Sequence, residues 1–250
     1  MRTAIIIPAR LQSTRLPEKP LCSLGGVPLV VCVARQAKKC RSAHTVVIAA
    51  DDMRIVRTAQ EYGCEAILTR PDHVSGSDRV AEAAALLQAT HVINLQGDEP
   101  FVNPADLDTV AVGLADTTSD IVTLRAPITD VMEYNNPNVC KVVRRTDNVA
   151  LYFSRSPIPY DRDGGVLPSD VYKHIGVYGF QHAALRRLTQ APPHPIEQRE
   201  GLEQLRALML GMTIRVLDSH GDGSSRGIDT PEDLAWANAR VKALGEAAFP

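Results

Sequence analysis

Basic side chains gather in one short segment near the start of the chain. Residues 9–20 (ARLQSTRLPEKP) contain Arg10, Arg15 and Lys19 with Ser13 among them. Guanidinium forks and an ammonium group beside backbone N–H groups are suited to binding a triphosphate. A solvated surface loop with scattered basic residues explains the same composition equally well. The residue types alone leave both interpretations open.

The same segment lacks two common nucleotide-binding fingerprints. The chain contains no G-x-x-x-x-G-K-[ST] P-loop, and no G-x-G-x-x-G follows its first apolar run. The pair Gly25-Gly26 comes later and is typical of a turn. An NAD-dependent oxidoreductase is therefore disfavoured.

Two acidic residues are candidates for holding a metal. Asp98 lies in the segment NLQGDEP at the end of a predicted strand, and Asp229 directly precedes a predicted helix start at Thr230. Magnesium favours a few carboxylate oxygens completed by phosphates and waters. Taken singly, each acid is at least as well explained by structure, Asp98 in a turn and Asp229 in a helix-start motif.

Polar side chains also gather in the second half of the chain. Arg155 ends a predicted strand, Arg162 lies in a predicted loop, and His174 opens the strand-like run 175–180. Together they could hold the carboxylate of an acidic co-substrate. The alternatives are a hydrogen-bonded structural histidine at 174, a core tyrosine at 178 and a solvated helix face around 203–204.

The elements that would position these residues alternate along the first half. The pattern predicts strands at 3–8, 44–50, 65–69 and 91–95 and helices at 29–39, 53–62 and 78–88. Pro28 and Pro104 fit the first turns of helices. This is typical of an α/β fold with a mostly parallel sheet flanked by helices, in which ligands bind beyond the carboxyl ends of the strands.

The pattern changes near residue 120. Runs 121–126, 139–145 and 149–153 follow one another without an obvious helix, which predicts an inserted antiparallel ribbon. A long loop is expected at 156–170, a helix at 195–210, a strand at 213–217 and a helix capped by Thr230. We therefore expect one domain over residues 1–250, with an inserted lobe at about 121–195.

Composition limits the partners of the chain. A net charge of −2 and 4% aromatic residues give no reason to bind nucleic acid or an anionic membrane. The five cysteines form no Cys-x-x-Cys pair, so free thiols in a reducing compartment are expected. No apolar run has the length of a signal peptide core or a membrane span, and a cytoplasmic location is predicted.

Eight segments in order resemble one known family, the 3-deoxy-manno-octulosonate (Kdo) cytidylyltransferases, also called CMP-Kdo synthetases. They are IIIPARLQSTRLPEKPL, TRPDHVSGSDRVAE, VINLQGDEP, NPNVCKVV, ALYFSRSPIP, KHIGVYGF, LEQLRAL and GIDTPEDL, and the resemblance as a whole extends from Ala4 to Trp236. The resemblance implies the nucleotide-diphospho-sugar transferase type of α/β fold. It also implies transfer of CMP from CTP to Kdo for lipopolysaccharide biosynthesis, with Mg²⁺, by a homodimer formed through the inserted lobe.

The resemblance also implies residue roles. Catalysis would fall to Arg15, Lys19 and Asp98, and metal binding to Asp98 and Asp229. Nucleotide contacts would come from Arg10, Ser13, Arg15, Lys19, Thr69, Arg70, Ser75, Gly76, Ser77 and Asp78. Contacts to the acid would come from Gln96, Arg155, Arg162, His174, Tyr178, Glu203 and Gln204.

Three departures from the family pattern concern the acid more than the nucleotide. Glu18 stands where the family usually has glycine, the segment 161–172 is shorter than in many relatives, and HGDGSSR at 220–226 is unusual. Two alternative acids therefore stay open, 8-amino-Kdo and the phosphonoformate of phosphonate biosynthesis. A non-catalytic nucleotide-binding module is a remoter alternative.

Overall fold

The computed structural model describes residues 2–162, 167, 170–221 and 227–245. The chain forms two compact units, the first from residues 1–108 and 225–250 and the second from residues 109–224. The second unit therefore interrupts the first in chain order and is longer at both ends than the predicted lobe at 121–195. Helix α4 (Pro104–Gly113) runs across the first boundary and begins at the predicted Pro104.

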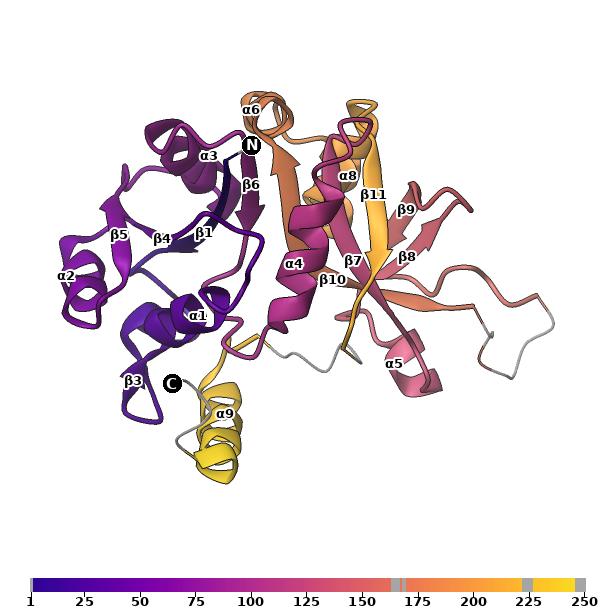
Figure 1. Ribbon diagram of the computed structural model, residues 1–250. Helices are drawn as coiled ribbons and strands as arrows, with labels where there is room; N and C mark the ends of the chain where they lie inside the picture. Colours follow the sequence, from indigo (N-terminus) through magenta and orange to yellow (C-terminus); the bar gives the residue numbers. More distant parts are fainter. Residues whose placement is uncertain (1, 163–166, 168–169, 222–226, 246–250) are drawn as a thin grey trace. The chain divides into compact units, whose positions relative to one another are not determined.

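The first unit is built on four parallel strands, visible in indigo and purple in Figure 1. Their order is β6 (His91–Asn94), β1 (Thr3–Ala9), β4 (Thr45–Ala50) and β5 (Glu65–Leu68). Nearly all of β1 is buried, as expected for a parallel strand covered on both faces. Helices α1 (Leu29–Ala37), α2 (Met53–Glu61) and α3 (Gly76–Leu86) pack against these strands. The predicted strands and helices of this half are confirmed, with ends shifted by no more than two residues.

Parallel strands end at a common edge, so the segments after β1, β4, β5 and β6 leave from the same side of the sheet. Two helices that start near this edge have side-chain caps. Ser75 and Asp78 form a reciprocal capping box at α3, and Asp52 accepts a hydrogen bond from Arg54 N at α2. The edge that collects the predicted site residues is therefore held by local hydrogen bonds.

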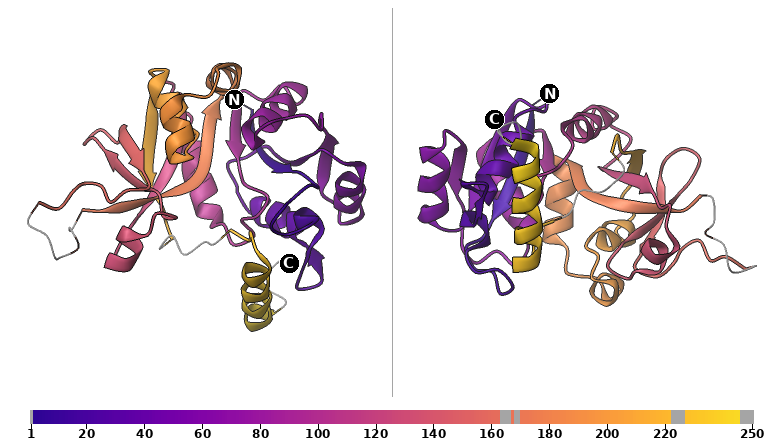
Figure 2. Two further views of the ribbon diagram at one scale, coloured as in Figure 1. Left: turned by 180° about the vertical axis from the view of Figure 1, so that it is seen from behind. Right: turned by 90° about the horizontal axis from the view of Figure 1, so that it is seen from below.

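The C-terminal helix α9 (Pro231–Leu244), yellow in Figure 2, belongs to the first unit and packs against the short strand at Ser23–Leu24. The predicted cap is confirmed, because Thr230 and Asp233 form a capping box. Ala237 packs in a cluster with Leu16 and Ile228. Asn238 accepts a hydrogen bond from Gly25 N at 2.9 Å. The helix thus supports both the basic loop and the segment that carries Asp229.

A short hairpin corrects the role predicted for Pro28. Strands β2 (Ser23–Leu24) and β3 (Val27–Pro28) pair around Gly25-Gly26, as the glycine pair indicates. Pro28 is therefore the residue before α1 and not part of its first turn. The one-turn 3-10 helix η1 (Lys19–Leu21) precedes this hairpin.

The strands of the second unit run in both directions. Strand β7 (Ile121–Pro127) lies between the parallel β11 (Ile214–Asp218) and the antiparallel β10 (Tyr172–Gln181). Strand β8 (Lys141–Arg144) pairs antiparallel with β9 (Ala150–Ser154) and with β10. Helices α5 (Val131–Asn135), α6 (His182–Gln190), α7 (Pro195–Glu200) and α8 (Gln204–Met209) complete the unit.

Two sequence predictions for this unit are wrong in part. The ribbon of three successive strands is interrupted by α5, which Asp130 caps, and β7 pairs with β10 and β11. Only the β8–β9 pair keeps the predicted arrangement. The single helix at 195–210 is two helices, because Gly201 adopts a left-handed φ of 62° that ends the first.

Two segments noted in the sequence fall partly outside the described residues. These are the loop 156–170, of which 163–166 and 168–169 are not described, and the segment HGDGSSR, of which 222–226 are not described. Within the described part of the chain, no helix has the length and apolar character needed to cross a membrane.

Candidate active site

A pocket of about 400 Å³ opens at the carboxyl edge of the parallel strands in the first unit. Its volume is in the range of small-molecule sites. Three segments that are distant in sequence supply most of its wall: the loop after β1, the segment before α3 and the turn after β6. The lining residues include nine that the sequence singled out, namely Arg10, Ser13, Arg15, Lys19, Ser75, Gly76, Gln96, Asp98 and Asp229.

Lys19 joins the two candidate metal ligands. Its Nζ lies 2.6 Å from Asp98 Oδ2 and 3.1 Å from Asp229 Oδ1. The Lys19 and Asp98 side chains are only 19% and 22% exposed. Burial opposes the charge of Lys19, but the two carboxylates outweigh it and raise the pKa of the ammonium group. The structure therefore brings two acids 131 residues apart in the chain (229 − 98) onto one cation.

Arg15 adds a second cation to this cluster. Its Nη2 lies 3.0 Å from Asp229 Oδ1, and its side chain is 65% exposed toward solvent. The main chain holds the acids in place, because Ile228 N donates to Asp98 O at 2.9 Å. Gly97 is required for close approach, since a Cβ there would lie 2.8 Å from Pro8 O. The pocket thus presents exposed positive charge beside a compact pair of carboxylates.

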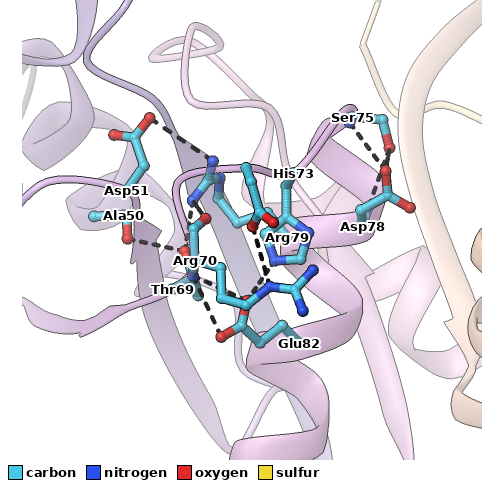
Figure 3. A network of polar contacts seen from close by, with 10 residues as sticks. Ala50, Asp51, Thr69, Arg70, His73, Ser75, Asp78, Arg79 and Glu82 are labelled. Atoms are coloured by element: carbon cyan, nitrogen blue, oxygen red, sulfur yellow. Dashed lines mark hydrogen bonds and ion pairs between the residues drawn. The ribbon is translucent and has the colours of Figure 1, made fainter.

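The segment before α3 forms another wall, shown in Figure 3. Ser75 and Gly76 line the pocket. Thr69 is buried, and its hydroxyl donates to Ala50 O at 2.9 Å. Arg70 is largely exposed and pairs with Asp72 at 3.1 Å. Asp78 is committed to the capping box with Ser75, and Ser77 is buried.

Among the residues that the structure describes, three more line this wall without having been predicted: His73, Val74 and Arg79. They lie inside the segment TRPDHVSGSDRVAE, whose resemblance to the family was their only signal. Arg79 is 4% exposed, although an arginine on a predicted helix is normally expected at the surface.

The predicted acid-binding residues lie in the second unit, apart from Gln96. His174 Nε2 is 2.8 Å from Thr123 Oγ1, and its ring centroid lies 5.1 Å from those of Phe153 and Tyr178. Burial lowers the pKa of His174 to about 3, and it raises the pKa of Tyr178 well above its usual value. Both side chains are therefore neutral at physiological pH and offer hydrogen bonds, not charge.

Arg155 is largely engaged by the protein itself. Its guanidinium donates to Glu200 O at 2.6 Å, Pro137 O at 3.0 Å and Gly201 O at 3.4 Å. Only the remaining N–H groups are available for a substrate carboxylate. Arg162 is exposed. Its acid contact and that of Arg155 stay predictions.

Glu203 and Gln204 differ in their surroundings. Glu203 lies 3.5 Å from Arg206 and is partly exposed. Gln204 is 6% exposed and donates to the Cys140 thiol at 3.8 Å, so the solvated helix face considered for it is wrong. The acid contacts of Glu203 and Gln204 stay predictions.

Glu18, the one family departure within the basic loop, has a clear structural setting. Its backbone is left-handed, with φ 50° and ψ 33°, a conformation that glycine adopts at least cost. Its carboxylate lies 2.8 Å from Arg54 Nη1, and Arg54 also pairs with Asp52 at 3.1 Å. The carboxylate is therefore engaged by a residue of α2.

In sequence, the chain is similar to cytidylyltransferases. The sequence model of a family described as cytidylyltransferase matches residues 4–214. The 3-deoxy-manno-octulosonate cytidylyltransferase of Chloroherpeton thalassium is 45% identical over 98% of both chains. The protein of the same name from Acidovorax ebreus is 45% identical over 92% of this chain and 94% of its own length.

Solved structures agree with the sequence relatives. A CMP:2-keto-3-deoxy-manno-octonic acid synthetase in complex with CTP superposes with a TM-score of 0.92 at 38% identity, over 98% of this chain and 100% of that one. A 4-diphosphocytidyl-2C-methyl-D-erythritol synthase from Anaerococcus prevotii has a TM-score of 0.64 at 14% identity, over 96% and 98% of the two chains. The second likeness concerns the fold alone.

Proposed function

We propose that the chain, which belongs to the 3-deoxy-manno-octulosonate cytidylyltransferase family, transfers CMP from CTP to Kdo and releases pyrophosphate. One observation carries the proposal. Lys19 bridges Asp98 and Asp229 in a pocket that also presents Arg10 and Arg15 at the carboxyl edge of a parallel sheet. This arrangement provides both charge for a triphosphate and carboxylates for a cation.

In nucleotidyl transfer the protein mainly positions groups and neutralises charge. A hydroxyl oxygen of the acid attacks the α-phosphorus of CTP, a P–O bond forms, and the bond to pyrophosphate breaks while the hydroxyl proton passes to water. Arg15 and Lys19 would stabilise the negative charge that grows on the leaving pyrophosphate. Arg10 and Ser13 would orient the triphosphate. No covalent intermediate with the enzyme is required.

We propose that Asp98 and Asp229 hold Mg²⁺. The donor set fits this ion, since two carboxylates already converge on one cation, the Lys19 ammonium group. Within the described ranges, no cluster of three or more His, Cys, Asp or Glu side chains could hold a metal, and magnesium needs only one or two carboxylates with phosphates and waters. When bound, the ion would reduce the charge of the triphosphate and favour attack at phosphorus.

We propose further that the enzyme is a homodimer through its second unit and acts in the cytoplasm in lipopolysaccharide biosynthesis. Exposed apolar side chains in that unit support a partner surface, among them Met132 at 75% and Leu151 at 58%. The five cysteines are free thiols, which fits a reducing compartment. A mass of about 54 kDa by light scattering, twice the 27.1 kDa of the chain, would support the dimer.

The activity is tested with purified protein, CTP, Mg²⁺ and one acid at a time, with pyrophosphate release as the measurement. Kdo should give a rate far above the rate without acid. Faster release with 8-amino-Kdo or phosphonoformate would reassign the acid and keep the reaction. CTP binding by calorimetry with no pyrophosphate from any of the three acids would instead favour a binding module.

Replacement of Glu18 by glycine should leave the KM for CTP within about threefold of the wild-type value, because the carboxylate is engaged by Arg54. Glycine removes the left-handed strain of about 1 kcal/mol but has a similar entropic cost, so thermal stability should change little. Initial rates and a thermal melt measure both effects. The matched variant Arg54→Ala frees the Glu18 carboxylate without changing its backbone. A tenfold change in KM for Glu18→Gly alone would mean that the carboxylate acts on the nucleotide.

A further inference from the structure

We propose that Arg79 is a positioning residue that sets the nucleotide affinity of the pocket by bracing two of its walls against each other. The inference rests on the proposed function for the identity of the nucleotide. Arg79 lines the pocket, yet its guanidinium contacts three protein groups from two other segments of the first unit, residues 69–70 and Asp51, as Figure 3 shows. It would therefore act through the loops it holds.

The first contacts of Arg79 hold the start of the 69–75 loop. Its Nη1 donates to Thr69 Oγ1 at 2.6 Å and to Arg70 O at 3.0 Å. The Thr69 hydroxyl in turn donates to Ala50 O at 2.9 Å at the end of β4. The loop is thus tied both to α3, which carries Arg79, and to the neighbouring strand.

Glu82, one helical turn after Arg79, holds the same loop from the other side. Its carboxylate accepts from Arg70 N at 3.1 Å and from the ring Nε2 of His73. The carbonyl of Arg70 is held by Arg79 and its N–H by Glu82, so the main chain at this residue is fixed by two side chains of α3. His73 and Val74, which follow directly, line the pocket.

A third contact connects this loop to the phosphate side. Arg79 Nη2 lies 3.7 Å from Asp51 Oδ2, and Asp51 Oδ1 accepts from Leu11 N at 2.9 Å. Leu11 directly follows Arg10, which lines the pocket. A continuous path of contacts therefore runs from the 69–75 loop through Arg79 and Asp51 to the loop that carries the predicted triphosphate contacts.

This path avoids the reacting groups. Lys19, Asp98 and Asp229 are linked to one another, and Asp98 is further tied to Ile228 by its main chain. Loss of the Arg79 contacts should therefore disturb the loops that bind the nucleotide. It should disturb Lys19, Asp98 and Asp229, which stabilise the transition state, much less. Such a loss of binding common to the ground state and the transition state raises KM and leaves kcat nearly unchanged.

The test is Arg79→Lys, which keeps the charge but lacks the fork that reaches Thr69, Arg70 and Asp51 together. The KM for CTP should rise about tenfold, the equivalent of roughly one lost hydrogen bond, with kcat within about threefold. Arg57→Lys makes the same change at an exposed position of α2 and should match the wild type. Calorimetry should show the same tenfold weaker CTP binding, which a merely destabilised fold would not produce below its melting temperature.

A second variant keeps the test decisive if Arg79→Lys does not fold. Asp51→Asn removes the charge that joins the two loops and should raise the KM for CTP in the same way. If both variants fold, the KM for CTP of the double variant should not exceed the higher KM of the two single variants, because both substitutions break the same path of contacts. Unchanged KM, or a fall in kcat at constant KM, overturns the proposal. Failure of the proposed function would appear differently, as wild-type protein that binds CTP but releases no pyrophosphate.

Discussion

Replacement of Asp98 by asparagine should lower kcat/KM for pyrophosphate release by about 10³-fold at a fixed Mg²⁺ concentration. Asparagine preserves the shape of the side chain and one oxygen, but it removes the negative charge that faces Lys19 at 2.6 Å. Because Asp98 is one of only two carboxylates proposed for the ion, its neutral amide should weaken metal binding sharply. The fold should survive, since the link to Ile228 uses the main-chain carbonyl of Asp98.

Initial rates measured against Mg²⁺ concentration check this expectation. The variant should need much more Mg²⁺ to reach half its maximal rate, and its maximal rate should stay low. Asp147→Asn is a matched control, because this acid is exposed in the second unit and pairs with Arg145. It should keep the wild-type rate within about twofold. If the Asp98→Asn enzyme keeps a tenth or more of the wild-type activity at saturating Mg²⁺, Asp98 is not a ligand of the metal.

The regular elements and the phosphate side of the site were predictable because their signals are local. Apolar runs and turn residues gave the four strands of the first unit, and basic residues after the first strand marked Arg10, Arg15 and Lys19. Asp98 and Asp229 were predictable as candidates for the same reason. Their convergence on Lys19 was not, because it depends on how distant segments pack.

Residues that act by holding other segments escaped prediction. Arg79 and Lys141 are charged side chains that sequence patterns assign to the surface, yet they are 4% and 0% exposed. The partners of Lys141 are main-chain carbonyls, and those of Arg79 include one, and such partners leave no trace in residue types. The left-handed backbone of Glu18 could not be predicted for a related reason, since a φ of 50° cannot be inferred from the residue type. Such residues become interpretable only when the backbone around them is known.

Replacement of Lys141 by methionine should lower the free energy of unfolding by about 3–5 kcal/mol. Lys141 lies in β8, and its Nζ donates to Asn136 O at 3.0 Å, Val139 O at 2.7 Å and Arg155 O at 2.5 Å. Methionine fills a similar volume but donates no hydrogen bond, so three carbonyls lose their shared donor. The segment 136–139 and the end of β9 would then lose a common anchor.

Urea unfolding followed by circular dichroism measures this effect, and a neighbouring lysine supplies the control. Lys173 pairs in register with Lys141 across β10 and β8, but its ammonium makes a 2.6 Å ion pair with Glu133. Lys173→Met removes a single ion pair whose side chains are 12% and 28% exposed, so it should cost less than the loss of three hydrogen bonds, about 2 kcal/mol. An equal decrease in the free energy of unfolding in the two variants would show that the three carbonyls find other hydrogen-bond donors when Lys141 is absent. A much larger loss of unfolding free energy for Lys141→Met would establish this buried ammonium as the group that holds the segment 136–139.

Arg155 contacts the same segment through Pro137 O, and its own carbonyl accepts from Lys141 Nζ. Lys141 would then help to position Arg155, and any contact of Arg155 with the acid would depend on the stability of β8 and β9.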